Sequence, residues 1–307
     1  EGREELLDFY FTVRNFLNIY ERVDEHYRIY TELTESGDFK IKLLCVNPIV
    51  HIGECLAQGN SSVFFSATLL PIRYYRQLLS NDEEDYTVYV NSPFSQEHRL
   101  LLAAADVTSR YTRRNRTEYR KILDYIRQAA EARKGNYIVF FPSYQYMNHV
   151  LEMLYDGRIG RPENRMTDAQ REDFLKEFEQ ERENSLVACC VMGGLFSEGI
   201  DLKEERLIGA IIVGTGLPMV CTEQEILKGY FDEEEQEGFA FAYQYPGMNK
   251  VMQAAGRVIR TAGDKGIILL LDDRFLRNDY RELFPREGDD CRRVTLKTVR
   301  QELDNFW

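Results

Sequence analysis

A glutamine and two arginines near the end of the chain are spaced to bind phosphate. Gln253, Arg257 and Arg260 follow one another at intervals of four and three residues, which brings them to one face if residues 249–260 form a helix. Gly256 removes side-chain bulk where a ligand or a neighbouring backbone must approach. Guanidinium groups match the geometry of phosphate oxygens. The spacing therefore predicts an anion site, which we favour over a surface helix with two solvated arginines.

A glycine-rich segment follows an apolar, strand-like run at residues 185–191. Residues 193–202 read GGLFSEGIDL. Glycines let backbone N–H groups face a ligand, and the segment adds a hydroxyl and carboxylates at the carboxyl end of a strand. The candidate ligand-contacting residues are Ser197, Glu198, Gly199 and Asp201. A plain turn in which Asp201 caps a helix fits the residues equally well.

A strand-to-helix turn carries a third candidate site. Residues 140–144 read FFPSY, which places Ser143 as the N-cap of the following helix, with Tyr144 next to it. The N-terminus of a helix can hold a phosphate group. Helix capping alone is the simpler interpretation of these residues taken without context.

Two hydroxyl groups end another strand-like run. We predict residues 62–66 as a short buried strand. Ser66 is its last residue, and Thr68 lies two residues further on. Hydroxyl groups at such a place can relay hydrogen bonds between two sites. An ordinary turn is the alternative.

One segment of the chain is densely basic. Arg113 and Arg114 belong to it, and Tyr111 and Tyr119 are interleaved with its cations. Arginines beside aromatic rings suit a phosphate backbone with stacked bases. A solvated helix face explains the run equally well. The cations of this run are Arg110, Arg113, Arg114, Arg116, Arg120 and Lys121.

Composition limits the classes of protein. The 307 residues include 39 Lys and Arg against 51 Asp and Glu, a net charge of −12, which argues against coating nucleic acid through bulk charge. No apolar run approaches the roughly 20 residues of a membrane span. The six cysteines form no C-x-x-C pair, so we expect reduced thiols, no metal site and a cytoplasmic protein.

Two motifs of nucleotide hydrolysis are absent from the sequence. It contains no G-x-x-x-x-G-K-[ST] phosphate loop and no strand followed by an Asp-Glu-x-His or Asp-Glu-x-Asp box for magnesium. We therefore expect this chain to be inactive as a nucleotide hydrolase on its own.

Strands and helices alternate along the chain from about residue 85. The strands are short and apolar, which favours an α/β fold with a mostly parallel sheet covered by helices on both faces. The predicted strands are 27–32, 39–46, 62–66, 88–90, 137–141, 185–191, 207–213 and 266–271. The predicted helices are 4–22, 49–56, a helix opened by Pro71, 115–134, a helix from 143, 168–181, 223–235, 249–260 and 297–305.

Taken in order, the motifs resemble those of superfamily 2 helicases, and most closely the XPD/DinG branch. The resemblance extends from about residue 4 to residue 285. The matching segments are 66–69 (SATL, motif III), 140–147 (FFPSYQYM, motif IV), 193–202 (motif V), 214–218 (GTGLP), 253–260 (QAAGRVIR, motif VI) and 271–275 (LDDRF).

The resemblance implies a particular domain organisation. Residues 1–82 would be the end of a first motor domain, and residues 83–307 a second RecA-like domain with a parallel sheet. Family members carry the phosphate loop, the magnesium-binding DEAH box and usually an iron–sulfur cluster upstream of motif III. ATP and Mg²⁺ would thus be bound mainly by a preceding N-terminal motor domain, with any iron–sulfur cluster there and none in this chain.

The resemblance also implies roles for the candidate residues. Arg260, as the arginine finger, and Arg257 would face the γ-phosphate, and Gln253 would orient the nucleotide or the attacking water. Glu198, Gly199 and Asp201 would contact the nucleotide. Ser143, Tyr144, Ser197, Arg113 and Arg114 would hold single-stranded DNA, and Ser66 and Thr68 would couple the two sites.

The resemblance implies an ATP-dependent DNA helicase that moves 5′ to 3′ on single strands and opens duplex junctions. It implies no membrane partner. Two alternatives are an RNA helicase and a non-enzymatic RecA-like scaffold that binds DNA. Paired arginines that face phosphate speak against the scaffold, whereas contacts to a phosphate backbone cannot separate DNA from RNA.

Overall fold

The computed structural model describes residues 2–34, 36–80, 82, 84–154, 168–180, 182–194, 206–234, 237–286 and 290–307. The chain forms two compact units, residues 1–87 with 219–242 and residues 88–218 with 243–307. The assignment of motor domains to 1–82 and 83–307 stays a prediction. The compact units differ from it because the segment 219–242 belongs to the first unit.

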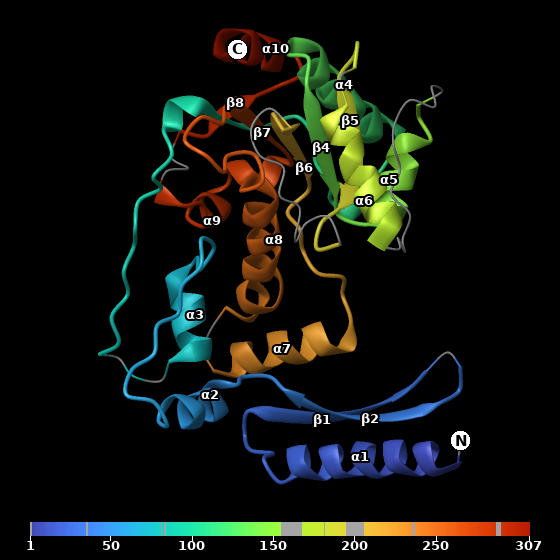
Figure 1. Cartoon of the computed structure of the whole chain (residues 1–307), viewed down its shortest axis with the longest axis vertical. Coiled ribbons are helices and arrows are strands. Elements are labelled where there is room, and N and C mark those ends of the chain that lie inside the picture. Colours follow the sequence, from blue (N-terminus) through green and yellow to red (C-terminus); the bar gives the residue numbers. More distant parts are fainter. Residues whose placement is uncertain are drawn as a thin grey trace. The chain divides into compact units, whose positions relative to one another are not determined.

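The first unit combines a β-hairpin with helices (Figure 1). Its elements are α1 (Gly2–Tyr20), β1 (Tyr27–Leu33), β2 (Phe39–Cys45), α2 (Ile49–Leu56), α3 (Ile72–Leu79) and α7 (Thr222–Glu233). β1 and β2 pair in antiparallel orientation. Glu223 attaches α7 to this hairpin, because it accepts a hydrogen bond from the Tyr30 hydroxyl at 2.8 Å and forms an ion pair with Lys42.

Two apolar runs that we predict as strands are not strands. Residues 62–66 have no regular secondary structure, and Phe65 is 89% exposed. Val88 and Val90 are also irregular, and each is 81% exposed. A strand needs a neighbour for its backbone N–H and C=O groups, and neither run pairs with a strand in the described part of the chain.

The second unit is built on a six-stranded sheet in the order β5-β4-β6-β7-β3-β8, in which every paired strand is parallel. This confirms the predicted α/β fold with a parallel sheet. Its strands are β3 (Arg99–Ala104), β4 (Asn136–Phe141), β5 (Leu186–Val191), β6 (Gly209–Val213), β7 (Gly266–Leu271) and β8 (Arg292–Val294). Its α-helices are α4 (Arg116–Ala132), α5 (Tyr144–Leu151), α6 (Asp168–Lys176), α8 (Tyr245–Ala255), α9 (Asn278–Arg281) and α10 (Val299–Phe306).

Helices cover both faces of this sheet (Figure 1). On one face, buried side chains of α4, α5 and α10 form a single cluster with alternate residues of the strands, such as Val139 and Ile211. On the other face Phe140 and Ile212 are fully buried, and α8 contacts β6. Burial on both faces explains why the strands are continuous apolar runs rather than alternating ones.

Candidate functional site

The carboxyl ends of the strands meet at one edge of the parallel sheet. From β4 the chain passes outward to β5, and it then returns across β4 to β6 before continuing to β7 on the other side. The connections from β4 and β6 thus leave in opposite directions. In parallel sheets, ligands bind at the carboxyl edge beside such a reversal of strand order. The turns after β4 and β6 are therefore the first place to look for a binding site.

Ser143 caps the helix that follows β4. Its Oγ accepts a hydrogen bond from the backbone N–H of Tyr146 at 3.1 Å, which confirms the capping interpretation. Tyr144 begins α5 and packs against the hydrophobic core. Burial raises the pKa of the Tyr144 phenol, and the nearby Cys190 raises it further. The first N–H groups of α5 lie at the carboxyl edge, and their use for phosphate stays a prediction.

Replacing Ser143 by alanine is expected to lower the free energy of unfolding of the second unit by about 1 kcal/mol, because the N–H of Tyr146 loses its cap. Urea unfolding followed by Trp307 fluorescence measures this change, since the single tryptophan of the chain lies in that unit. Ser143→Asp restores an acceptor and should recover most of the stability. An alanine variant as stable as the wild type would show that the cap contributes nothing.

The turn after β6 requires glycine at two of its positions. Gly214 and Gly216 have φ angles of 81° and 68°. A Cβ on Gly214 would lie 2.5 Å from Oγ of Ser109, and a Cβ on Gly216 would lie 2.5 Å from the carbonyl oxygen of Gly247 in α8. The turn is thus packed between the loop after β3 and the first turns of α8, and it fixes where α8 begins.

The predicted helix over 249–260 ends earlier, at Ala255. Gly256 is the C-cap, where low helix propensity favours an end, and the β-branched Val258 follows. Beyond it, Asp264 accepts hydrogen bonds from the backbone N–H groups of Arg260 and Thr261, each at 2.7 Å, and holds this segment as a turn. The shared helical face proposed for the three side chains is therefore wrong.

The structure does not bring the two arginines to the carboxyl edge. α8 starts beside the Gly216 turn at that edge and leads back toward the start of β7. The side chain of Val258 reaches Gly266, the first residue of β7, with its Cγ1 2.3 Å from the position of a Cβ there. Arg257 and Arg260, both partly buried, thus follow the far end of α8. Their assignment to a nucleotide stays a prediction.

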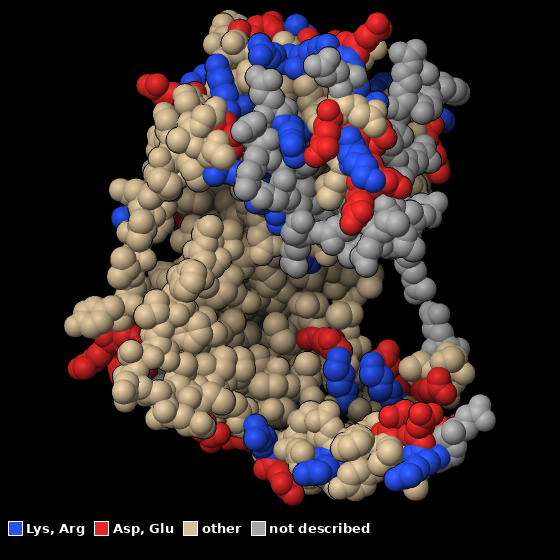
Figure 2. Space-filling model, in the orientation of Figure 1, with Lys and Arg blue, Asp and Glu red and all other residues tan. Residues whose placement is uncertain are grey.

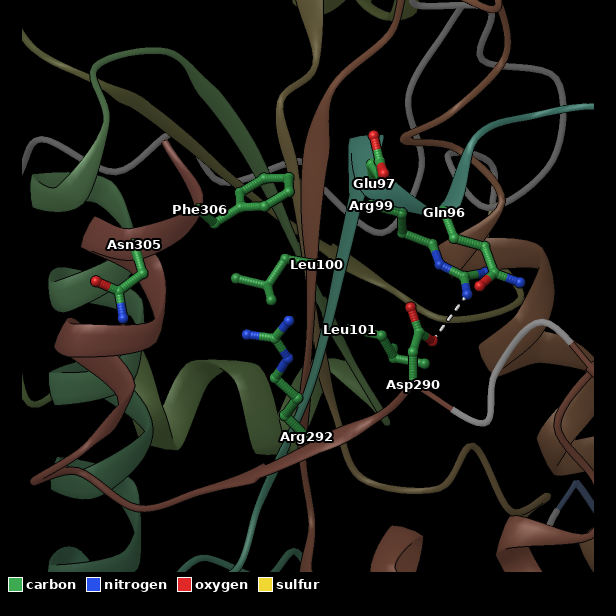
Figure 3. Close-up of a pocket in the computed structure, with 9 residues that line it drawn as sticks. All are labelled: Gln96, Glu97, Arg99, Leu100, Leu101, Asp290, Arg292, Asn305 and Phe306. Carbon is green, nitrogen blue, oxygen red and sulfur yellow. Dashed lines mark hydrogen bonds and ion pairs between the residues drawn. The ribbon is translucent and has the colours of Figure 1, made fainter.

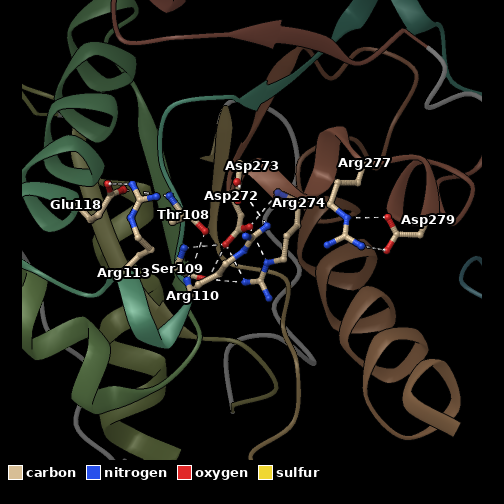
Figure 4. A network of polar contacts seen from close by, with 10 residues as sticks. All are labelled: Thr108, Ser109, Arg110, Arg113, Glu118, Asp272, Asp273, Arg274, Arg277 and Asp279. Atoms are coloured by element: carbon tan, nitrogen blue, oxygen red, sulfur yellow. Dashed lines mark hydrogen bonds and ion pairs between the residues drawn. The ribbon is translucent and has the colours of Figure 1, made fainter.

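A buried carboxylate organises the loop after β3 (Figure 4). Asp272 is fully buried directly after β7, and it accepts hydrogen bonds from the N–H and Oγ of Ser109 at 2.8 and 2.7 Å. Nε and Nη2 of Arg274 complete its shell at 2.8 and 2.9 Å. Burial alone would raise the pKa of Asp272, but the ion pair with Arg274 and the Ser109 hydrogen bonds outweigh it and hold the pKa below its ordinary value.

Sequence reasoning did not assign a role to Asp272. The available signal was an acidic residue directly after an apolar strand, followed two residues later by Arg274. Ser109, its other partner, lies 163 residues away in the sequence. No local pattern identifies that contact, because it depends on β3 and β7 being neighbours in the sheet.

Part of the basic run is used within the protein. The carboxylate of Glu118, whose side chain is only 3% exposed, pairs with Arg113 at 3.0 Å and Lys121 at 3.1 Å. The Arg114 guanidinium lies over the Tyr146 ring at 4.9 Å from its centroid, and its Nε donates to the carbonyl oxygen of Ser109 at 3.2 Å. Arg113 and Arg114 therefore have structural contacts, and a second role with nucleic acid stays a prediction.

The remaining predicted site residues lie elsewhere. Ser66 is exposed and Thr68 is partly buried in the first unit, and they bond to each other, with Ser66 Oγ accepting from the N–H of Thr68 at 3.2 Å. This is the ordinary turn of the alternative interpretation. Ser197, Glu198, Gly199 and Asp201 lie outside the described residues.

Other parts of the second unit do not add to this site. A cavity of about 260 Å³ opens at the amino ends of β3 and β8, the opposite edge of the sheet, where Arg99 pairs with Asp290 at 3.0 Å (Figure 3). On the face shown in Figure 2, acidic and basic side chains are interspersed, so any contact with nucleic acid is local. Within the described ranges, no three His, Cys, Asp or Glu residues are grouped to hold a metal ion, and no helix is long and apolar enough to cross a membrane.

The chain matches the helicase C-terminal domain family over residues 126–290, more than half of its length, and it belongs to that family. Its relatives belong to the XPD/DinG branch. It is 29% identical over 250 residues to the ATP-dependent DNA helicase XPD of Sulfolobus acidocaldarius, covering 76% of this chain and 43% of that protein. It is 24% identical over 239 residues to the 3′-5′ exonuclease DinG of Staphylococcus saprophyticus, covering 75% of this chain and 26% of that protein.

The structural comparison agrees with these matches. A solved structure of apo XPD aligns with a TM-score of 0.68 at 19% identity, covering 92% of this chain and 57% of that chain. This similarity confirms the fold. The chain spans less than half the length of the two curated relatives and matches the C-terminal part of an XPD/DinG-type helicase. The predicted family resemblance is thus confirmed.

Proposed function

We propose that this chain is the C-terminal motor domain of an ATP-dependent DNA helicase that couples ATP hydrolysis to 5′-to-3′ movement on single-stranded DNA and to duplex unwinding. The observation that carries the proposal is the placement of two candidate phosphate sites around α8. One lies at the carboxyl edge beside Ser143, and the other follows the far end of α8 with Arg257 and Arg260. A motor needs separate contacts for the strand and for the nucleotide, and two candidate sites at different ends of one helix support such a division.

The nucleotide site would be completed by a second domain. Arg260 and Arg257 would supply positive charge to the γ-phosphate of an ATP whose phosphate loop and Mg²⁺ ligands lie in a preceding motor domain. Gln253, one turn before Arg257 in sequence and still on α8, would orient the nucleotide or water. Glu198, Gly199 and Asp201 would contact the nucleotide and sense its state, and any iron–sulfur cluster belongs to the preceding part.

The strand site would hold backbone phosphates. Ser143, Tyr144 and Ser197 would contact single-stranded DNA, with Arg113 and Arg114 beside them, and Ser66 and Thr68 would couple the sites. ATP binding closes the gap between motor domains and hydrolysis opens it, so that each domain grips the strand differently in the two states. Alternating grip moves the motor along the strand toward a duplex junction.

ATPase measurements test this function. The longer gene product that we propose contains this chain should hydrolyse ATP with stimulation by single-stranded DNA, whereas this chain alone should not hydrolyse it. Stronger stimulation by RNA of the same sequence would instead indicate an RNA helicase. Absence of hydrolysis from the longer product, with DNA binding retained, would indicate a scaffold.

Salt dependence of binding tests the role of Arg113 and Arg114. If both contact phosphate, replacing them by alanine should reduce the log–log slope of affinity for single-stranded DNA by about 0.7 for each lost contact. Fluorescence anisotropy with a labelled oligonucleotide measures the slope. Because Arg113 also pairs with Glu118, urea unfolding must accompany the experiment. An unchanged slope with reduced stability would limit both arginines to their contacts within the protein.

A further inference from the structure

Lys250 is the middle residue of α8, about one turn before Gln253. Its side chain is partly buried and runs against Gly193, the second residue after β5. The Lys250 Cε, Cδ and Nζ atoms lie 3.5, 3.6 and 3.8 Å from the position of a Cβ on Gly193. Gly193 has a φ angle of 72°, so its backbone conformation is one that other residues rarely adopt.

The position of Gly193 places this ammonium group at the carboxyl end of β5, the strand next to β4, after which α5 begins. Phe141 of β4 is paired with Val191 of β5, and the N–H of Met192 donates to the carbonyl oxygen of Phe141 at 2.9 Å. Ser143 and Gly193 thus each lie two residues beyond the last paired residues of these adjacent strands. Ser143 accepts a hydrogen bond from the N–H of Tyr146. The other N–H groups in the first turn of α5 have no acceptor within the helix.

Lys250 has no carboxylate partner in the part of the chain that the structure describes. No ion pair or hydrogen bond of its Nζ is found with any described residue, although the chain carries a net charge of −12. The other cations near this edge are engaged, because Arg113 pairs with Glu118 and Arg114 stacks on Tyr146. An anion beside this partly buried ammonium group would compensate its charge.

We propose that Lys250 binds a backbone phosphate of single-stranded nucleic acid at the carboxyl ends of β4 and β5, together with the first N–H groups of α5. This inference rests on the proposed function and adds a contact residue to the strand site. A helix N-terminus favours an anion through its dipole, and the ammonium group supplies the full positive charge.

The anion bound by Lys250 could also be a phosphate group of the nucleotide. The geometry favours the strand, because Lys250 contacts Gly193 at the carboxyl edge, whereas Ala255 lies five positions further along α8, a rise of about 7.5 Å away from that edge. Arg257 and Arg260 follow beyond that end, with Val258 against the first residue of β7. Lys250 thus contacts a residue just after β5 at the carboxyl edge, whereas the arginines assigned to ATP follow the far end of α8.

The test uses this chain and a fluorescein-labelled oligothymidylate, with affinity measured by anisotropy over a range of salt concentrations. Lys250→Ala is expected to bind about tenfold more weakly and to reduce the log–log slope by about 0.7. Lys250→Arg should keep both. Lys297→Ala is the matched control, because this exposed lysine follows β8 at the other side of the sheet and should bind as the wild type does.

The outcomes separate this inference from the proposed function. Wild-type affinity and slope in Lys250→Ala would overturn the inference and leave the proposed function intact. Loss of fluorescent ATP-analogue binding when Lys250→Ala is made in the longer gene product, with unchanged oligothymidylate binding, would assign the lysine to the nucleotide and also overturn it. A wild-type chain that does not bind the oligonucleotide would overturn both. Equal urea midpoints of the variants and the wild type ensure that affinity, not folding, is compared.

Discussion

Replacing Arg260 by alanine is expected to reduce ATP hydrolysis by the longer helicase that we propose about 10³- to 10⁵-fold, the range typical of an arginine finger. The guanidinium group would stabilise charge on the transferring phosphoryl group, so the loss should appear in kcat. Steady-state release of phosphate at saturating single-stranded DNA measures the effect. Arg260→Lys should recover only part of the rate, because an ammonium group lacks the planar, bidentate geometry.

The local fold is expected to survive this substitution. Asp264 holds the turn through the backbone N–H groups of residues 260 and 261, and these remain whatever the side chain at 260 is. Arg300→Ala serves as the matched control, since Arg300 lies on α10 in an exposed ion pair with Asp304 and should leave hydrolysis unchanged. ATPase activity of Arg260→Ala within a few-fold of the wild type would remove the assignment of the arginine finger.

The pattern of apolar runs predicted most of the sheet. β4, β5, β6 and β7 lie where β-branched and aromatic runs are bounded by turn residues, and β7 begins and ends as predicted. β3 was missed because its residues, RLLLAA, are strong helix formers without β-branching. β8 has only three residues, two of them arginine, and its place depends on pairing with β3.

Errors arose where a local pattern was taken without its tertiary context. The apolar run 62–66 satisfies strand propensity but has no partner strand among the described residues, and it is exposed. The helical spacing of residues predicted a helix that continues past Gly256 to residue 260. In the structure, the Asp264 carboxylate accepts hydrogen bonds from the N–H groups of residues 260 and 261, which a longer helix would bond to its own carbonyl groups. The spacing of residues along a helix does not reveal such a side-chain acceptor beyond its end.

The sequence predicted which motifs form the candidate site, but not how their side chains are arranged in space. Residue types at 143 and 253–260 indicated phosphate chemistry, and the capping role of Ser143 is confirmed. The sequence grouped these motifs through their order, but α8 separates them along its length. The contact of Lys250 with Gly193 had no signal in the sequence, because it depends on how α8 lies against the end of β5.

Replacing Asp272 by alanine is expected to lower the free energy of unfolding of the second unit by about 3–5 kcal/mol, the effect typical of breaking a buried ion pair from one side. The substitution leaves Arg274, whose side chain is only 14% exposed, without its carboxylate, and it removes the acceptor of the Ser109 N–H and hydroxyl. Trp307 fluorescence in urea follows this unit, because the chain has a single tryptophan and it lies there.

A double variant separates the ion pair from simple loss of packing. Asp272→Ala combined with Arg274→Leu removes both charges, so it should be more stable than the sum of the two single changes predicts. Asp273→Ala is the matched control, because its carboxylate lies at 3.6 Å from Arg110 in a half-exposed pair and should change stability little. Additive losses, or a cost of Asp272→Ala below about 1 kcal/mol, would contradict a central role for this carboxylate.

The pH dependence gives an independent measurement of the same group. The pKa of Asp272 lies below its ordinary value in the folded chain, so the unfolded chain takes up the proton first as pH falls. The stabilisation from ionised Asp272 is therefore complete above its unfolded pKa of about 3.9 and is lost as pH falls through the folded pKa. Asp272→Asn should lack this component, and the difference in stability between wild type and Asp272→Asn should shrink below about pH 4. A difference that stays constant down to pH 2 would show that the charge of Asp272 does not stabilise the folded unit.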